Sequence, residues 1–272
     1  MKLAVIGTGQ MGRAITSGLL MNKVFSANQI IGVEKMDAAR DTFLSLASDQ
    51  LSCATNIEDG CREASVVLLA VKPQQFSEVL SELAKIDQLA TKLFLSIAAG
   101  VTLERIQQAL GKDARIIRAM PNTPVLVNKG VTAFAGNVRA TEEDLRVAEK
   151  IFGSTGCAYR VKEDVLDTVT ALSGSGPAYF YLFVDCLCQA AAARGLKPEM
   201  ALDMAARTAL GAATMLLETK KSPAELIAQV RSKGGTTEAA LRVFEERGLA
   251  PLCEAAVDAA WKRSKELASS SS

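Results

Sequence analysis

Three glycines near the start of the chain have a spacing that lets a peptide backbone approach a phosphate group. The stretch "VIGTGQMG" places Gly7, Gly9 and Gly12 as G-x-G-x-x-G between an apolar segment and a helical pattern. In a strand–turn–helix unit the first glycine permits the tight turn, the second admits a pyrophosphate, and the third allows close packing of helix on strand. Glu34 ends the next apolar segment, where a carboxylate commonly binds a ribose 2′-hydroxyl. These residues predict a dinucleotide site, and a glycine turn without nucleotide is the alternative.

The charged residues around Glu34 favour different forms of a nicotinamide dinucleotide. Glu34 should repel a 2′-phosphate and so favours NAD(H). Lys35 and Arg40 are close in sequence and could bind that 2′-phosphate instead. The sequence therefore leaves both NADPH and NADH open as the cofactor.

Three further segments follow apolar strands and could meet the same ligand. "AVKPQQF" at 70–76 places Lys72 at a strand end, where ligands bind in open sheets. "SIAAGV" at 96–101 offers small residues against which a flat nicotinamide ring could lie, and "RAMPNTPV" at 118–125 stiffens a loop around Asn122 with two prolines. The alternative for 70–76 is a turn with a solvated lysine. For 96–101 it is simple tight packing, and for 118–125 it is a rigid turn without a ligand.

Two segments rich in Gly, Ser and Thr lie in the C-terminal part, each before a helical pattern. They are "ALSGSGPAYFY" at 171–181 and "KGGTTEAAL" at 233–241. Free N–H groups and hydroxyls at a helix start bind anions. Together the segments predict a small anionic ligand, and plain helix caps are the alternative.

Composition narrows the chemistry. The 272 residues include no histidine, which excludes imidazole acid–base catalysis and most zinc sites, so we expect no metal. With 31 basic and 30 acidic residues and only 5% aromatics, the chain favours neither nucleic acid nor a membrane surface. Six scattered cysteines without a C-x-x-C pair, and no export signal or apolar span, predict reduced core thiols in a cytoplasmic protein.

Apolar segments alternate with helical patterns up to about residue 160, which predicts a parallel sheet covered by helices on both faces. After that point only helical patterns follow, with Gly195 and Gly248 at expected C-caps. The predicted fold class is α/β: a Rossmann-like doubly wound sheet in residues 1–160, then an all-helical dimerisation domain in residues 161–272. The predicted strands are 2–7, 29–34, 65–71, 93–99, 114–120 and 131–136. The predicted helices are 9–22, 36–48, 74–86, 102–110, 141–152, 163–174, 177–195, 197–219, 222–233, 236–248 and 250–268.

The segment from Pro177 to Ala193 has almost no polar stripe. Such a helix must be buried on several sides, and a lone five-helix domain has little room for that. We therefore expect a dimer interface here, with a central helix inside one subunit's core as the alternative.

Six motifs along the chain resemble those of the pyrroline-5-carboxylate reductase family, in order and from Lys2 to about Leu267. They are "IGTGQMG", "AVKPQQ", "SIAAGVT", "IIRAMPNTP", "LSGSGPAY" and "GGTTEAALRVFEERG". The resemblance implies reduction of 1-pyrroline-5-carboxylate to L-proline with hydride from NADPH or NADH, the last step of proline biosynthesis. It also implies an interlocked homodimer, often assembled into a decamer of five dimers.

The resemblance also assigns site residues. Backbone N–H groups near Gly234, Gly235 and Thr236 would bind the substrate carboxylate, and the hydroxyl of Thr237, the one predicted catalytic residue, would contact the ring nitrogen. The predicted substrate-binding residues are Ser173, Gly174, Ser175, Gly234, Gly235, Thr236 and Thr237. The predicted cofactor-binding residues are Gly7, Thr8, Gly9, Gln10, Met11, Gly12, Glu34, Lys35, Asn56, Ala70, Val71, Lys72, Pro73, Ala98 and Ala99.

Two positions depart from the family pattern: Lys233 replaces a common proline, and Arg231 stands where a small residue is common. These changes put the exact backbone contacts of the substrate loop in doubt, and leave the reaction class unchanged. Other readings are another imine reductase, a β-hydroxyacid dehydrogenase, and a non-catalytic NAD(P)-sensing scaffold. The hydroxyacid enzymes generally use a lysine where this chain reads "LSGSGPAYFY", which argues against them.

Overall fold

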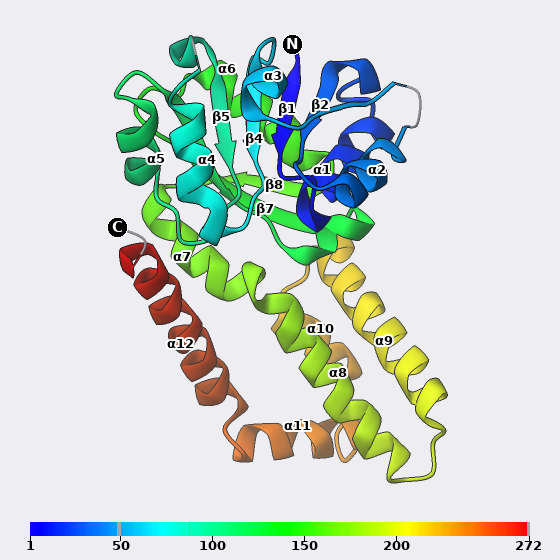
Figure 1. Cartoon of the computed structure of the whole chain (residues 1–272). Coiled ribbons are helices and arrows are strands. Elements are labelled where there is room, and N and C mark those ends of the chain that lie inside the picture. The colour runs from blue at the N-terminus through cyan, green and yellow to red at the C-terminus, as the bar shows by residue number, and fades with distance from the viewer. Residues whose placement is uncertain (48–49, 87, 271–272) are drawn as a thin grey trace. The chain divides into compact units, whose positions relative to one another are not determined.

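A computed structural model describes residues 1–47, 50–86 and 88–270 (Figure 1). Contacts divide the chain into two compact units. The first comprises Met1–Ser175 and the C-terminal segment that starts at Ala260, and the second comprises Gly176–Ala259. The predicted domain boundary after residue 160 follows the end of the last strand rather than this grouping, and it stays a prediction.

The described part of the first unit contains an eight-stranded sheet with the order β3-β2-β1-β4-β5-β6-β7-β8. The strands from β3 across to β6 are parallel, β7 is antiparallel to β6, and β8 is parallel to β7. Their bounds are β1 Leu3–Ile6, β2 Ile30–Val33, β3 Ser52–Ala54, β4 Val66–Leu69, β5 Leu93–Ser96, β6 Arg115–Met120, β7 Gly130–Gly136 and β8 Gly156–Arg160.

Helices cover both faces of this sheet, as predicted. In β1, Leu3 and Val5 belong to one buried cluster, whereas Ala4 and Ile6 belong to the other, because successive side chains of a strand point to opposite faces. Helices α1 (Gln10–Met21), α2 (Asp37–Leu44) and α6 (Glu142–Gly153) supply the first cluster. Helices α3 (Ile57–Cys61), α4 (Phe76–Leu83), α5 (Leu103–Leu110) and α7 (Leu166–Val169) supply the second.

The sequence prediction missed β3 and β8, which form the two edges of the sheet, and the short helix α3. Edge strands need only one buried face, and β8 accordingly has alternating, mostly exposed side chains in place of a continuous apolar run. The sheet is mostly parallel, as predicted, and the sequence analysis did not foresee that β7 runs antiparallel to β6. Only residues 121–129 join these strands, and a parallel crossover needs a dozen residues or more.

The second unit is helical. Its helices are α8 Gly176–Ala192, α9 Pro198–Thr219, α10 Pro223–Val230, α11 Thr236–Glu246 and the part of α12 (Leu249–Ser270) that ends at Ala259. Helices α8 and α9 pack against each other, and Phe183 of α8 meets Phe244 of α11 with ring centroids 6.0 Å apart. Gly195 and Gly248 both have positive φ, the left-handed conformation expected after a helix end.

Within the single chain, α8 does not form a buried core helix. Of its residues only Gly176 is buried, while Phe180, Tyr181 and Leu182 are each about two-thirds exposed, at 69%, 66% and 65%. The alternative that α8 lies inside one subunit's core is therefore wrong for this chain. The apolar surface is left for a partner to cover.

Helix α9 meets the length and hydropathy criteria for a membrane-crossing helix, with 22 residues and a window hydropathy of 1.2. The sequence analysis did not expect such a segment. The criterion is weak evidence, since apolar helices of soluble proteins also pass it. In this chain α9 carries the same kind of exposed apolar side chains as α8, including Leu210 and Leu217.

The six cysteines are free thiols, but only some of them belong to the core. Burial raises the pKa of Cys61 to about 12 and that of the partly buried Cys53 to about 11. Both thiols stay protonated near neutral pH and pack as apolar groups. The prediction of core thiols was wrong for Cys157, Cys186 and Cys253, which are exposed.

A buried lysine fastens the start of β5 to the end of α3. The Lys92 side-chain Nζ donates to the carbonyl oxygens of Cys61 at 2.7 Å and Ala64 at 2.8 Å. Lys92 is only 5% exposed, so its charge is balanced by these carbonyl dipoles. The Cys61 carbonyl also accepts from the Ala64 N–H at 3.2 Å, so the ammonium adds a second donor at the helix end and supplies one to the Ala64 carbonyl that follows it.

Replacing Lys92 by methionine should keep the volume and remove the donor. Two buried carbonyls would lose a charged partner, so we expect the free energy of unfolding to fall by about 2–4 kcal/mol. Urea unfolding at fixed protein concentration measures the change, and the exposed Lys85→Met variant is the control. Equal stability of the two variants would show that Lys92 does not hold this turn.

Candidate functional site

The carboxyl ends of the parallel strands lie in register, and this brings the predicted cofactor residues to one edge of the sheet. The last residue of β1, Ile6, pairs with Val33 of β2 and Leu69 of β4. Leu69 in turn pairs with Ser96 of β5. The chain turns away from β1 in opposite directions at this point, with β2 on one side and β4 on the other, which is where open α/β sheets bind ligands.

The glycines of the first loop have the geometry that their predicted roles need. Gly7 has φ +91°, and a Cβ there would lie 2.9 Å from the backbone of Ala70. At Gly12 a Cβ would lie 2.2 Å from the carbonyl oxygen of Gly7, so only glycine lets α1 pack this closely on the turn. Gly9 differs, because a Cβ there would meet nothing within 4 Å. This open space lies at the N-terminus of a 12-residue helix, a place suited to a diphosphate.

Glu34 points back to this loop. Its Oε2 accepts hydrogen bonds from the backbone N–H and the hydroxyl of Thr8, both at 3.3 Å, and Thr8 is fully buried. Its Oε1 accepts from the N–H of Met36 at 3.2 Å. The carboxylate is therefore fixed beside the glycine loop, at the end of β2 where a ribose would be expected.

The two basic residues considered for a 2′-phosphate have other partners. Lys35 donates to Glu78 at 3.0 Å and Glu82 at 3.2 Å, and these hydrogen bonds raise its pKa. Arg40 donates to the carbonyl oxygens of Glu34 and Lys35 and forms an ion pair with Asp37. Either side chain would have to leave a partner in order to bind a phosphate.

The remaining predicted cofactor residues follow the neighbouring strands. Asn56 caps α3 by accepting from the N–H of Asp59 at 2.8 Å, just after β3. Ala70 to Pro73 follow β4, and Lys72 is exposed at the start of a 3₁₀ turn. After β5, Ala98 is buried while Ala99 is exposed. Gln10 and Met11 open α1.

The segment around Ser173 does not interrupt the helix as predicted. Residues Thr170–Gly174 form a π-helical turn between α7 and α8, in which the Ser175 N–H donates to the Thr170 carbonyl at 2.8 Å. Pro177 has no N–H for the carbonyl of Ser173, and the side-chain amide of Asn122 donates to it instead at 3.0 Å. Asn122 therefore anchors this turn, and π turns of this kind often occur at functional sites.

The predicted carboxylate loop is partly satisfied by its own helix. The Gly234 N–H donates to Oε2 of Glu238 at 2.8 Å, and the Gly235 N–H donates to the Ser232 carbonyl at 3.0 Å. Arg231 lies 3.7 Å from Oε1 of the same glutamate. The N–H groups of Thr236, Thr237 and Glu238 begin α11 and have no carbonyl partner within the helix.

The predicted site residues are divided between the two compact units. It brings the cofactor residues together at one sheet edge, with Ser173, Gly174 and Ser175 in the same compact unit. Gly234 to Thr237 belong to the second unit. The sequence analysis missed Glu238, although a glutamate three residues after an N-cap is a known capping signal.

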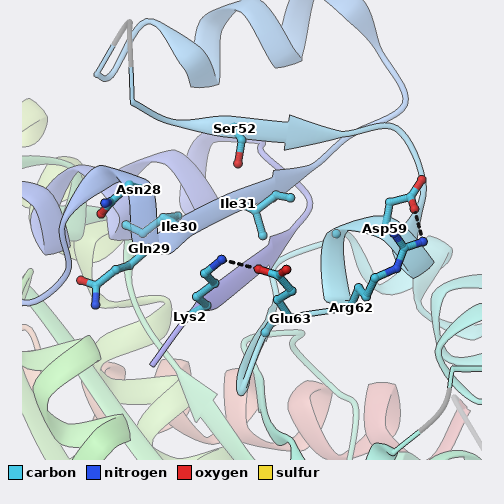
Figure 2. Close-up of a pocket in the computed structure, with 11 residues that line it drawn as sticks. Lys2, Asn28, Gln29, Ile30, Ile31, Ser52, Asp59, Arg62 and Glu63 are labelled. Carbon is cyan, nitrogen blue, oxygen red and sulfur yellow. Dashed lines mark hydrogen bonds and ion pairs between the residues drawn. The ribbon is translucent and has the colours of Figure 1, made fainter.

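The cavity in Figure 2 is separate from this edge. Its volume is about 230 Å³, and it is lined by residues at the amino ends of β1, β2 and β3. Lys2 pairs with Glu63, and Arg62 pairs with Asp59 at 2.6 Å, so the charges on its wall neutralise one another. None of the predicted site residues lines it.

Known proteins resemble the chain over its whole length. The family model for pyrroline-5-carboxylate reductase dimerisation matches residues 163–267, and that for coenzyme F420-dependent NADP oxidoreductase matches residues 2–100. A pyrroline-5-carboxylate reductase of Synechocystis sp. is 39% identical, with 98% of each chain covered. The Escherichia coli enzyme of that name is 37% identical, with 99% of each covered.

Solved structures give the same result. A pyrroline-5-carboxylate reductase from Coxiella burnetii matches with a TM-score of 0.92 and 38% identity, and 98% of each chain is covered. A Plasmodium falciparum pyrroline carboxylate reductase with NADP bound matches with a TM-score of 0.86 and 28% identity, again over 98% of each chain.

Two glycine variants separate packing from ligand contact in the first loop. Gly9→Ala should leave the melting temperature unchanged, because its Cβ meets no protein atom within 4 Å, and should weaken NADPH binding at least tenfold. Gly12→Ala should lower both the melting temperature and the affinity for NADPH, since its Cβ would collide with the Gly7 carbonyl. Thermal unfolding and NADPH fluorescence titration measure the two effects. Unchanged NADPH affinity in Gly9→Ala would remove the diphosphate from this loop.

Proposed function

Because the chain belongs to the pyrroline-5-carboxylate reductase family, we propose that it reduces 1-pyrroline-5-carboxylate to L-proline with NADPH or NADH, the last step of proline biosynthesis. The observation that carries this proposal is full-length similarity: relatives of that name are 37–39% identical over nearly the whole of both chains. The fixed glycine loop and the aligned strand ends fit the dinucleotide that such a reaction needs.

The residues that would hold the dinucleotide lie along the sheet edge. The N-terminus of α1 at Gly9 to Gly12 would receive the diphosphate, and Glu34 would receive the adenosine ribose. The exposed Ala99 and the segment Ala70–Pro73 would flank the nicotinamide. When bound, the reduced nicotinamide supplies a hydride to the imine carbon.

The rest of the chemistry needs little from the protein. A protonated imine already accepts hydride readily, so a strong side-chain acid is unnecessary, in keeping with the absence of histidine. The N–H groups at the start of α11 would bind the substrate carboxylate, and the Thr237 hydroxyl would orient the ring nitrogen. Positioning and exclusion of water then lower the barrier.

The helical unit supports assembly into a homodimer. The family model that matches residues 163–267 is one for dimerisation, and this region holds the exposed apolar faces of α8 and α9. A second copy would cover residues such as Phe180 and Leu217, which are otherwise exposed to water. Such burial also accounts for the hydropathy of α9. A decamer of five dimers and a cytoplasmic location remain parts of this proposal.

The choice between NADPH and NADH depends on Glu34 and its basic neighbours. Glu34 is held by Thr8 at the expected ribose position, where its charge disfavours a 2′-phosphate. Lys35 is engaged by Glu78 and Glu82 and is not poised to bind a 2′-phosphate in this form. The guanidinium of Arg40 lies beside the Glu34 carbonyl and could bind a 2′-phosphate by giving up Asp37. We propose that NADPH, where it is used, relies on Arg40.

Nicotinamide absorbance tests the reaction directly. Purified protein mixed with 1-pyrroline-5-carboxylate should oxidise NADPH or NADH, at a rate that depends on the imine. The ratio of the two rates measures which cofactor Glu34 and Arg40 select. Nucleotide binding without any turnover of the imine would contradict the reaction and favour a sensing role.

Replacing Thr237 by alanine should lower kcat/KM by roughly 10- to 1000-fold, the cost of one positioned hydrogen bond of about 1.5–4 kcal/mol. Thr237→Ser is the matched control, because it changes the same position and keeps the hydroxyl. Steady-state kinetics with both substrates varied gives the comparison. Equal kinetics in the two variants would take Thr237 out of the mechanism.

A further inference from the structure

A buried arginine lies under the loop that follows β5. Arg118 on β6 pairs in register with Ser96, the last residue of β5, and its side chain is only 8% exposed. A buried guanidinium needs partners for its N–H groups. The sequence signal is an arginine within the apolar strand "ARIIRAM", and the function proposed above does not use it.

The first partner of Arg118 fixes the far end of that loop. The Arg118 Nη1 atom donates to Oε1 of Glu163 at 3.0 Å. The same oxygen accepts from the N–H of Leu103, the first residue of α5, at 2.8 Å. Glu163 thus caps α5 and ties it to β6, so residues 97–102 are held at both ends.

The second partner connects this network to the end of the chain. Arg118 Nη2 lies 4.0 Å from Oδ1 of Asp167 in α7. That oxygen accepts a hydrogen bond from the Ser264 hydroxyl of α12 at 2.7 Å. Ser264 is 6% exposed, so a polar side chain on the last turns of α12 is buried against α7. The C-terminal end of α12 lies beside α7 in Figure 1.

The end of α12 also lies directly on the loop. Gly100 has φ +75°, and a Cβ at that position would be 3.2 Å from the Leu267 Cβ and 3.3 Å from the Leu267 carbonyl carbon. Gly100 is buried under this turn, whereas its neighbour Ala99 is exposed. The loop therefore has α12 behind it, with Ala99 facing outward.

We propose that the last turns of α12 are a positioning element for hydride transfer, acting through the Ser264–Asp167–Arg118 bridge and the contact of Leu267 with Gly100. The inference rests on the proposed function, in which the exposed Ala99 lies against the nicotinamide. The helix supports the loop from behind and sets how far Ala99 projects toward the ring. Ser264, Asp167 and Arg118 are positioning residues, since they act through the loop.

A positioning role predicts an effect on kcat that is separate from any effect on NADPH affinity. Hydride transfer is sensitive to the separation of donor and acceptor, and a displacement of about 1 Å far from the chemistry can cost up to a hundredfold in rate. Affinity for the dinucleotide depends mainly on the loop at Gly7–Gly12 and on Glu34, which the bridge does not touch. A loosened α12 should therefore lower kcat and leave NADPH affinity nearly unchanged.

The test compares Ser264→Ala with Ser264→Thr, which keeps the hydroxyl, in the full-length protein. Arg263→Ala is the control, because Arg263 is the exposed neighbour on the same helix and, among the described residues, forms its ion pair with Glu266, three residues further along that helix. We expect kcat to fall about tenfold in Ser264→Ala. In Ser264→Thr and in Arg263→Ala, kcat should stay within threefold of the value for the unmodified chain. The Kd for NADPH should change less than twofold, and the deuterium isotope effect from 4-deuterated NADPH should rise.

Ser264→Ala with full kcat and an unchanged isotope effect would overturn the proposal, whether or not its melting temperature falls. So would a loss of kcat that Ser264→Thr does not restore. Asp167→Asn gives a second reading: it retains an oxygen acceptor for Ser264 and removes the charge that faces Arg118, and it should lower kcat with NADPH affinity retained. Failure of the proposed function would instead appear as an unmodified chain that does not reduce the imine.

Discussion

The alignment of the parallel strand ends is the constraint on which the rest of the first unit depends. Because Ile6, Val33, Leu69 and Ser96 lie at one level of the hydrogen-bonded ladder, every loop that follows them emerges at the same edge. Apolar strands that are buried on both faces fix this register, since a slip by one residue would exchange the two buried clusters. The proposed cofactor site, although spread over five segments of sequence, thus needs no long-range contact beyond the sheet itself.

The helical unit follows a different rule. Its helices begin and end with clear local signals, such as the Ser222–Glu225 capping box of α10 and the left-handed glycines at 195 and 248. Its apolar surface is nevertheless left largely uncovered by the chain that carries it. Local signals are sufficient to specify where these helices begin and end. Their exposed apolar faces are removed from solvent only when the chain assembles with another copy.

Much of the fold could be predicted from the sequence, because strong periodicity and glycine spacing are local properties. The segments Leu3–Ile6 and Val66–Leu69, the G-x-G-x-x-G turn and the helix caps all belong to this class. The edge strands could not be found, since short half-exposed segments carry little apolar pattern. Nor could the partners of Arg118, because these depend on side-chain directions that the fold sets. The contact of Glu238 with the Gly234 N–H follows a local capping signal that the sequence analysis missed. The expected exposed helix start at Ser173 was wrong because a π turn continues the helix through it.

The bond between Asn122 and the π turn has an implication for how such chains can vary. Pro177 leaves the Ser173 carbonyl without a helical donor, and Asn122 uses its amide N–H for that carbonyl and its amide oxygen for the Val131 N–H at 2.8 Å. Aspartate at 122 could accept but not donate, and any other residue at 177 would bring back the missing N–H. We therefore expect the two positions to vary together. A lineage that loses the proline no longer needs the amide N–H at position 122, whereas one that keeps the proline needs a side chain there that both donates and accepts.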